Sequence, residues 1–139
     1  MSDLIRKRLT GKEEGFTLIE LLVVIVILGI LMAIAVPSYM GFKDRANKTA
    51  AMANVRSAIP SVELYYQDNT ANPSTYTGIT TELVRDIDPG LASTVVINNG
   101  TADSYCISAE QGGYTAKTLG PGKPIEVGTD VSACAVVVP

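Results

Sequence analysis

Few side chains in this sequence could make or break covalent bonds. The chain of 139 residues contains no histidine, which excludes a Ser/His or Cys/His nucleophilic pair and any histidine-bearing metal site. Its two cysteines, Cys106 and Cys134, are too few for a zinc cluster, and no Ser-x-x-Lys sequence follows residue 36. We therefore expect no enzyme activity, no cofactor and no bound metal.

The acidic turn Asp86-Ile87-Asp88-Pro89-Gly90 is the strongest candidate for an ion site. It lacks the spaced carboxylates and the terminal glutamate of a calcium-binding loop. We expect a solvated turn here.

Glu20 is the most unusual carboxylate of the chain, because it lies in an apolar stretch. The segment from Phe16 to Val36 has 21 residues, and Thr17 and Glu20 carry its only polar side chains. A charge inside a bilayer costs roughly 2.5 to 3.5 kcal/mol near the centre and less toward the edge. Such a group is usually paired, but this segment contains no Lys or Arg. Glu20 should therefore find its cation elsewhere.

Residues 16–36 are long enough to cross a bilayer as one helix. At about 1.5 Å per residue they span roughly 31 Å, close to the thickness of the hydrocarbon core. Basic residues lie on both sides of this segment in nearly equal numbers, and the small excess in residues 1–15 favours an N-terminus on the cytoplasmic side. They are Arg6, Lys7, Arg8 and Lys12 before the segment, and Lys43, Arg45 and Lys48 after it.

Residues 38–68 are expected to form an amphipathic helix. Apolar residues recur there at spacings of three and four, which places them on one helix face that packs against another element. They are Met52, Val55, Ile59, Val62 and Tyr66. Pro60 should kink this helix by removing a backbone donor, and the polar sequence after Tyr66, with Asn72-Pro73, should end it.

Residues 69–139 have the composition of a loop followed by a small antiparallel sheet. Short runs of β-formers alternate with turn residues, among them Asn99-Gly100, whose chemistry suits a hairpin. The expected strands are residues 94–97, 105–108, 114–117 and 133–138. The fold class is therefore α+β, with a long N-terminal helix packed on a small antiparallel sheet.

The charge distribution argues against a nucleic-acid reader. The net charge is −3, and no basic run exceeds Arg6-Lys7-Arg8. We expect no sequence-specific binding of nucleic acid.

A specific motif begins at the end of the charged leader. Gly15-Phe16-Thr17-Leu18-Ile19-Glu20 is followed by apolar residues to Val36 and then by Pro37. This sequence closely resembles the N-terminus of type IV prepilins and related pseudopilins, tightly over about residues 11–42. The resemblance implies that a prepilin peptidase cuts between Gly15 and Phe16 on the cytoplasmic side and methylates the new amine of Phe16.

The resemblance also assigns roles to other residues. It implies that Glu20 is the assembly residue, paired with the Phe16 amine of a neighbouring subunit. Gly29 and Pro37 bracket a stretch of helix that can unwind in a filament. Cys106 and Cys134 match the disulfide-bounded C-terminal loop of many pilins, and two exported cysteines permit only one connectivity.

The implied function is structural. Such a subunit is stored in the cytoplasmic membrane and then polymerises into a helical surface filament that serves adhesion, twitching motility or DNA uptake. Its partners would be further copies of itself, the prepilin peptidase, membrane lipid before assembly and, indirectly, the assembly platform and its ATPases. The alternative is a pseudopilin of a type II secretion or competence system, although a major secretion pseudopilin typically lacks this disulfide and binds calcium.

Two simpler interpretations of the N-terminus stay open. In one, residues 21–32 are the apolar core of a secretory signal and Ala33-Ile34-Ala35 is its cleavage site. In the other, the segment is a single-span anchor that is neither cut nor assembled. Both leave Glu20 without an explanation.

Overall fold

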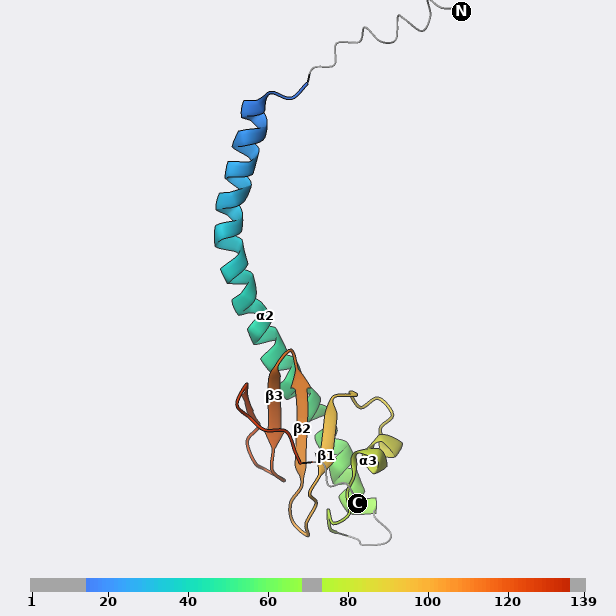
Figure 1. Ribbon diagram of the computed structural model, residues 1–139. Coiled ribbons are helices and arrows are strands. Elements are labelled where there is room, and N and C mark those ends of the chain that lie inside the picture. The colour runs from blue at the N-terminus through green and yellow to red at the C-terminus, as the bar shows by residue number, and fades with distance from the viewer. Residues whose placement is uncertain (1–14, 69–73, 136–139) are drawn as a thin grey trace, which may run out of the picture. The chain divides into compact units, whose positions relative to one another are not determined.

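A computed structural model describes residues 15–68 and 74–135. The chain divides into two units, residues 1–40 and 41–139, which we describe separately. The described residues form two helices and four strands (Figure 1). The elements are α2 (Leu18–Asp68), α3 (Thr81–Ile87), β1 (Val95–Asn98), β2 (Cys106–Gln111), β3 (Tyr114–Thr118) and β4 (Glu126–Gly128).

The first unit contains the start of α2, and the apolar side chains described there are exposed. Leu18 is 82% exposed and Ile25 is 60% exposed. Within the described residues, α2 is the one helix with the length and apolar character needed to cross a bilayer. This agrees with the membrane segment predicted from the sequence.

The second unit packs the later part of α2 against the sheet. The strands follow the order β1-β2-β3-β4, and each neighbouring pair is antiparallel (Figure 1). Ile97 of β1 lies opposite Ile107 of β2, and Ala109 of β2 lies opposite Ala116 of β3. Residues two apart on one strand share a face, so these side chains form one apolar surface toward the core.

The helix contributes the residues that the spacing of apolar positions predicts. Val55 and Val62 are fully buried, while Met52, Ile59 and Tyr66 are partly buried against the core. The small residues Ala51 and Ala58 are also fully buried. The structure describes α2 as far as Asp68, and both the helix end predicted there and the kink at Pro60 stay predictions.

The turn between β2 and β3 explains why this hairpin forms. Gln111 pairs with Tyr114, so Gly112 and Gly113 form a two-residue loop. Both have positive φ, +57° and +83°, as a type I′ turn requires, and glycine adopts this conformation without steric cost.

The strand predicted at residues 133–138 is wrong over its described part, and two elements were not predicted. Residues 133–135 form no strand, and residues 136–138 lie outside the described part. The N–H of Cys134 donates instead to the hydroxyl of Ser108, so a side chain takes the bond that a ladder would use. The last strand is β4, which begins two residues after Pro124, and α3 is capped by Thr80, whose hydroxyl accepts from the N–H of Leu83.

Candidate functional site

The carboxylate of Glu20 is bound by the residue that precedes its own helix. The N–H of Thr17 donates to Oε2 of Glu20 at 2.8 Å, and the Thr17 hydroxyl donates to the same oxygen at 2.7 Å. The N–H of Glu20 donates to Oγ1 of Thr17 at 3.3 Å. This reciprocal pattern is a capping box, in which Thr17 is the N-cap of α2 and Glu20 is the third helical residue.

The sequence argument missed this box, although its signal was present. Thr17-Leu18-Ile19-Glu20 has the Thr-x-x-Glu spacing that marks a capped helix start. The box means that the carboxylate has local donors within its own chain and does not have to enter lipid without partners. One carboxylate oxygen, Oε1, receives no hydrogen bond from the described residues.

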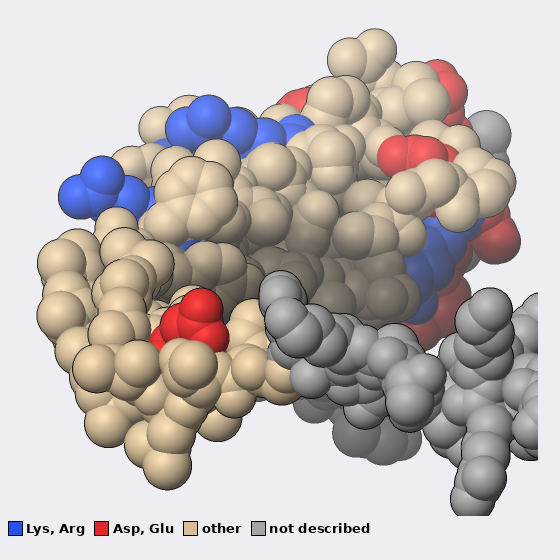
Figure 2. Space-filling model, turned by 90° about the horizontal axis from the view of Figure 1, so that it is seen from above, with Lys and Arg blue, Asp and Glu red and all other residues tan. Residues whose placement is uncertain are grey.

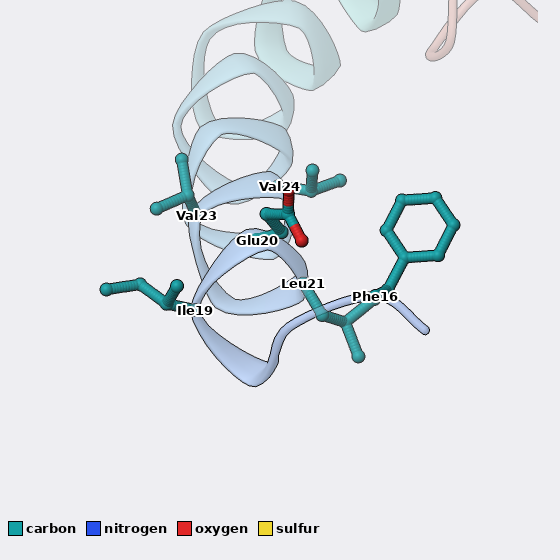
Figure 3. A pocket seen from close by; sticks show the side chains of 6 residues that line it. All are labelled: Phe16, Ile19, Glu20, Leu21, Val23 and Val24. Carbon is teal, nitrogen blue, oxygen red and sulfur yellow. The ribbon is translucent and has the colours of Figure 1, made fainter. Parts of the chain in front are cut away.

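The side chains around Glu20 form an apolar surface. A shallow depression there is lined by Phe16, Ile19, Glu20, Leu21, Val23 and Val24. Ile19 and Val23 project on one side of the helix and the Phe16 ring on the other (Figure 3). Between residues 15 and 40 Glu20 is the only charged residue. Figure 2 shows that acidic and basic atoms form small groups among uncharged residues on the face it presents.

The residues of the expected cleavage site are exposed in the described part of the chain. Phe16 is 91% exposed, and no described atom lies within 4 Å of a Cβ added at Gly15. Gly29 likewise has no neighbour within 4 Å, and both Gly29 and Pro37 lie inside α2. These positions therefore carry no packing role within the single chain, and their roles in processing and helix unwinding stay predictions.

The two cysteines are joined in the structure. The disulfide links Cys106, the first residue of β2, to Cys134, with a Cα–Cα distance of 5.8 Å. The amide of Asn98 donates to the carbonyl of Ala135, so β1 also holds the C-terminal segment. This segment is therefore fixed to two neighbouring strands.

A tyrosine cluster, Tyr66, Tyr76 and Tyr105, includes two hydroxyls that bind Glu63 of α2. The hydroxyl of Tyr76 donates to Glu63 at 2.9 Å and that of Tyr105 at 3.2 Å. The Tyr76 ring lies 4.6 Å from that of Tyr66 and 4.8 Å from that of Tyr105, between centroids. Burial, together with the nearby Glu63 charge, raises the pKa of Tyr105 to about 12 and also raises the pKa of Tyr76. Sequence reasoning placed Tyr66 in the core but had no signal for its partners, which lie far away in the chain.

The acidic turn is a structural feature of the fold. Oδ1 of Asp88 accepts from the N–H of Gly90 at 2.9 Å, and Oδ2 accepts from the hydroxyl of Ser61 at 3.4 Å. Among the residues that the structure describes, no three metal-ligating side chains come together. The local bonds account for Asp88 without an ion.

Several known proteins are similar in sequence to this chain. Residues 11–36 match the family described as the prokaryotic N-terminal methylation motif. Core protein G of the type II secretion system of Escherichia coli is 37% identical over 86 residues, which are 62% of this chain and 59% of that protein. The corresponding protein of Pseudomonas aeruginosa is 44% identical over 68 residues, 49% of this chain and 48% of its own.

A further relative is matched over more of its length. The type IV wide pilus major component PilA4 of Thermus thermophilus is 33% identical over 102 residues, which are 73% of this chain and 76% of that protein. In contrast, the chain spans only about half the length of the two core G proteins. No solved structure matches.

Proposed function

The chain belongs to the type IV pilin and pseudopilin family, whose members are structural proteins and not enzymes, and we propose that it is the subunit of a type IV pilus. The observation that carries this proposal is the disulfide between Cys106 and Cys134, which closes the C-terminal part of the sheet. Many pilins have such a loop. The likeness to the wide-pilus component, which continues beyond the N-terminal helix over 102 residues, supports the same assignment.

The proposed processing divides the chain at Gly15. Residues 1–15 are a leader that the prepilin peptidase removes on the cytoplasmic side, and the same enzyme methylates the amine of Phe16. Residues 16–37 form the membrane and assembly helix, residues 38–68 continue it into the globular head, and residues 69–139 complete the head. Before assembly the subunit is a single-pass protein of the cytoplasmic membrane, and after assembly it is part of a surface filament.

Glu20 is the proposed assembly residue. Its free oxygen can accept the positively charged Phe16 amine of an incoming subunit, while Thr17 holds the other oxygen. Opposite charges attract strongly where water is excluded. A subunit in the wrong register leaves the amine or the carboxylate unpaired, so this contact sets register as well as affinity. Gly29 and Pro37 supply the helix with weak points that allow local unwinding during assembly.

Filament formation proceeds by contact among copies of this chain. The assembly platform and its ATPases would drive it without binding the exported head. Adhesion, motility or DNA uptake would then be properties of the polymer.

The second candidate is a pseudopilin of a type II secretion or competence system. It is favoured by the identity to core protein G from several bacteria. The described residues do not bring together the carboxylates of a calcium site, which argues for the pilus.

Deletion of this protein tests the assignment. Cells without it are expected to lose surface filaments by electron microscopy and to keep their secreted enzymes. The purified protein should show the same Tm with calcium as with a chelator. Retained filaments with lost secretion, or a calcium-dependent rise in Tm, would instead establish the pseudopilin.

A further inference from the structure

Basic residues follow the apolar segment on the side where the globular unit begins. Lys43, Arg45 and Lys48 lie within 12 residues of Val36. Basic residues close to a span normally gather on the cytoplasmic side. In the proposed orientation these three lie on the opposite side, where their charges disfavour insertion in that orientation. We therefore ask which nearby groups these three positive charges contact.

Lys48 makes a contact of this kind inside the globular unit. Its Nζ lies 5.0 Å from the centroid of the Tyr114 ring, a cation–π contact with the start of β3. Gly112 of the same hairpin approaches Asn47 so closely that a Cβ at residue 112 would collide with the Asn47 amide. The helix face with Asn47 and Lys48 is therefore occupied by the β2–β3 hairpin.

Lys43 and Arg45 make no such contact with the described residues. Both are exposed, and no salt bridge joins either of them to another described residue. At 3.6 residues per turn, Phe42 lies between Lys43 and Arg45 around the helix, on the side away from Asn47. Phe42 is 72% exposed. The result is a large apolar ring flanked by two basic side chains.

In the chain these three residues lie just beyond the headgroup layer that borders the apolar segment, within reach of long side chains. Phe42 is six positions after Val36 and Arg45 is nine positions after it, so at about 1.5 Å per residue they lie at most roughly 9 to 14 Å beyond the apolar segment. Headgroup regions add about 5 to 8 Å on each side of the hydrocarbon core. Long basic side chains can reach back toward the phosphates from just outside this layer.

We propose that Phe42, Lys43 and Arg45 form an interfacial anchor that binds the phosphates of anionic phospholipids while the subunit is stored in the membrane. Phe42 inserts its ring between the headgroups, and Lys43 and Arg45 each contact a phosphate on either side of it. The apolar span is continuous with this surface along the chain, and the charge of the two side chains is complementary to the ligand. The proposal rests on the proposed function only for membrane storage, which a pilin and a pseudopilin share.

Reconstitution of the full chain in bilayers tests the anchor. The probe is spin-labelled phosphatidylglycerol compared with spin-labelled phosphatidylcholine, in a phosphatidylcholine bilayer that contains about 30% phosphatidylglycerol. The measured quantity is the relative association constant of the two labelled lipids at the protein surface. The test variant is Lys43→Gln with Arg45→Gln. The matched control is Arg56→Gln with Lys123→Gln, which removes the same charge from two exposed residues of the globular unit farther from the apolar segment in the chain.

The double variant at residues 43 and 45 is expected to lose about half or more of the preference for phosphatidylglycerol, because each basic residue at the surface attracts anionic lipid. The control should keep the preference. The leader's own basic residues contribute equally to all the proteins, so the difference between variants is the readout. Added salt at about 1 M should abolish most of that difference.

An unchanged preference in the Lys43→Gln, Arg45→Gln protein would overturn the anchor. An equal loss in the control would also overturn it, because lipid would then respond to net charge alone. If lipid preference is unchanged but filament yield falls, these residues contact a neighbouring subunit and not lipid. Membrane insertion is checked by flotation. Filament yield of the Glu20 variants, discussed below, tests the proposed function separately.

Discussion

The two units of the chain differ in how far their apolar side chains are buried. In the first unit Ile25 is 60% exposed, whereas Ile107 of the second unit is completely buried. The second unit obtains its stability from its own sheet and helix, and the first unit has surface that only lipid or other protein can cover. The same helix, α2, contributes to both. Substitutions in the first unit should therefore alter assembly, and substitutions in the second should alter stability.

The largest effect is expected at Glu20. Glu20→Ala should reduce filaments at least tenfold, because it removes both the charge and the helix cap. Glu20→Gln keeps a side chain that can complete the cap but removes the charge, so it should be nearly as severe. Shear-fraction immunoblots, read against the membrane pool, measure this effect. Neither variant should reduce membrane insertion or cleavage after Gly15, which intact-mass spectrometry checks.

Thr17→Val is the matched variant that separates the two roles of Glu20. It removes the hydroxyl that donates to Oε2 and leaves the charge in place. Filament yield should fall far less than in Glu20→Gln. If Thr17→Val abolished filaments while Glu20→Gln left them at wild-type levels, the cap and not the charge would be the basis of assembly.

The disulfide is expected to make the next largest contribution, and only in the second unit. A bond between Cys106 and Cys134, which are 28 positions apart, should stabilise the fold by about 3.6 kcal/mol through the chain entropy of the unfolded state. Cys106→Ser with Cys134→Ser should lower the free energy of unfolding by about this amount. Denaturant titration in detergent, followed by near-UV circular dichroism, provides the measurement. A loss below about 1 kcal/mol would show that the C-terminal segment is held mainly by other contacts.

A matched pair of isoleucines tests the contrast directly. Ile107→Ala should cost about 3 kcal/mol, because it leaves a cavity between the sheet and α2. Ile25→Ala should change the unfolding of the globular unit by less than about 0.5 kcal/mol, since its side chain contacts no core. The same titration serves for both proteins. Equal losses would mean that the two units are one cooperative structure.

The smallest expected effect is in the tyrosine cluster. Tyr105→Phe removes one hydrogen bond to Glu63 and should cost about 1 kcal/mol at pH 7. The folded pKa of Tyr105, about 12, lies above the unfolded value of about 10. Its contribution is therefore fully present below pH 10 and is lost as the pH rises through 12. The wild-type protein should lose stability across this range, and Tyr105→Phe should lose less. Parallel pH curves for the two proteins would contradict the role of this hydroxyl.

Much of the architecture could be predicted because it depends on local patterns. The apolar stripe with Val55 and Val62 predicted the buried face of α2, and the run at residues 94–97 predicted a strand, which the structure has as β1. The cysteine pair allowed only one bond. The family motif indicated Glu20 as a site before any geometry was known.

The remaining features depend on contacts that spacing alone does not reveal. β4 is three residues long, too short for a periodic signal, and Cys134 bonds to a side chain where a strand was expected. The partners of Glu63 are 13 and 42 residues away. The Thr17 cap is a local feature with a signal in the sequence, the Thr-x-x-Glu spacing at the start of α2.

The capping box also bears on how reversible the polymer can be. A subunit that leaves a filament loses the amine of its neighbour, but Glu20 keeps both donors from Thr17. The carboxylate would therefore return to lipid with its hydrogen bonds from Thr17 still formed. In the proposed filament, removal of the subunit would break only the contact of Glu20 with the neighbour's amine.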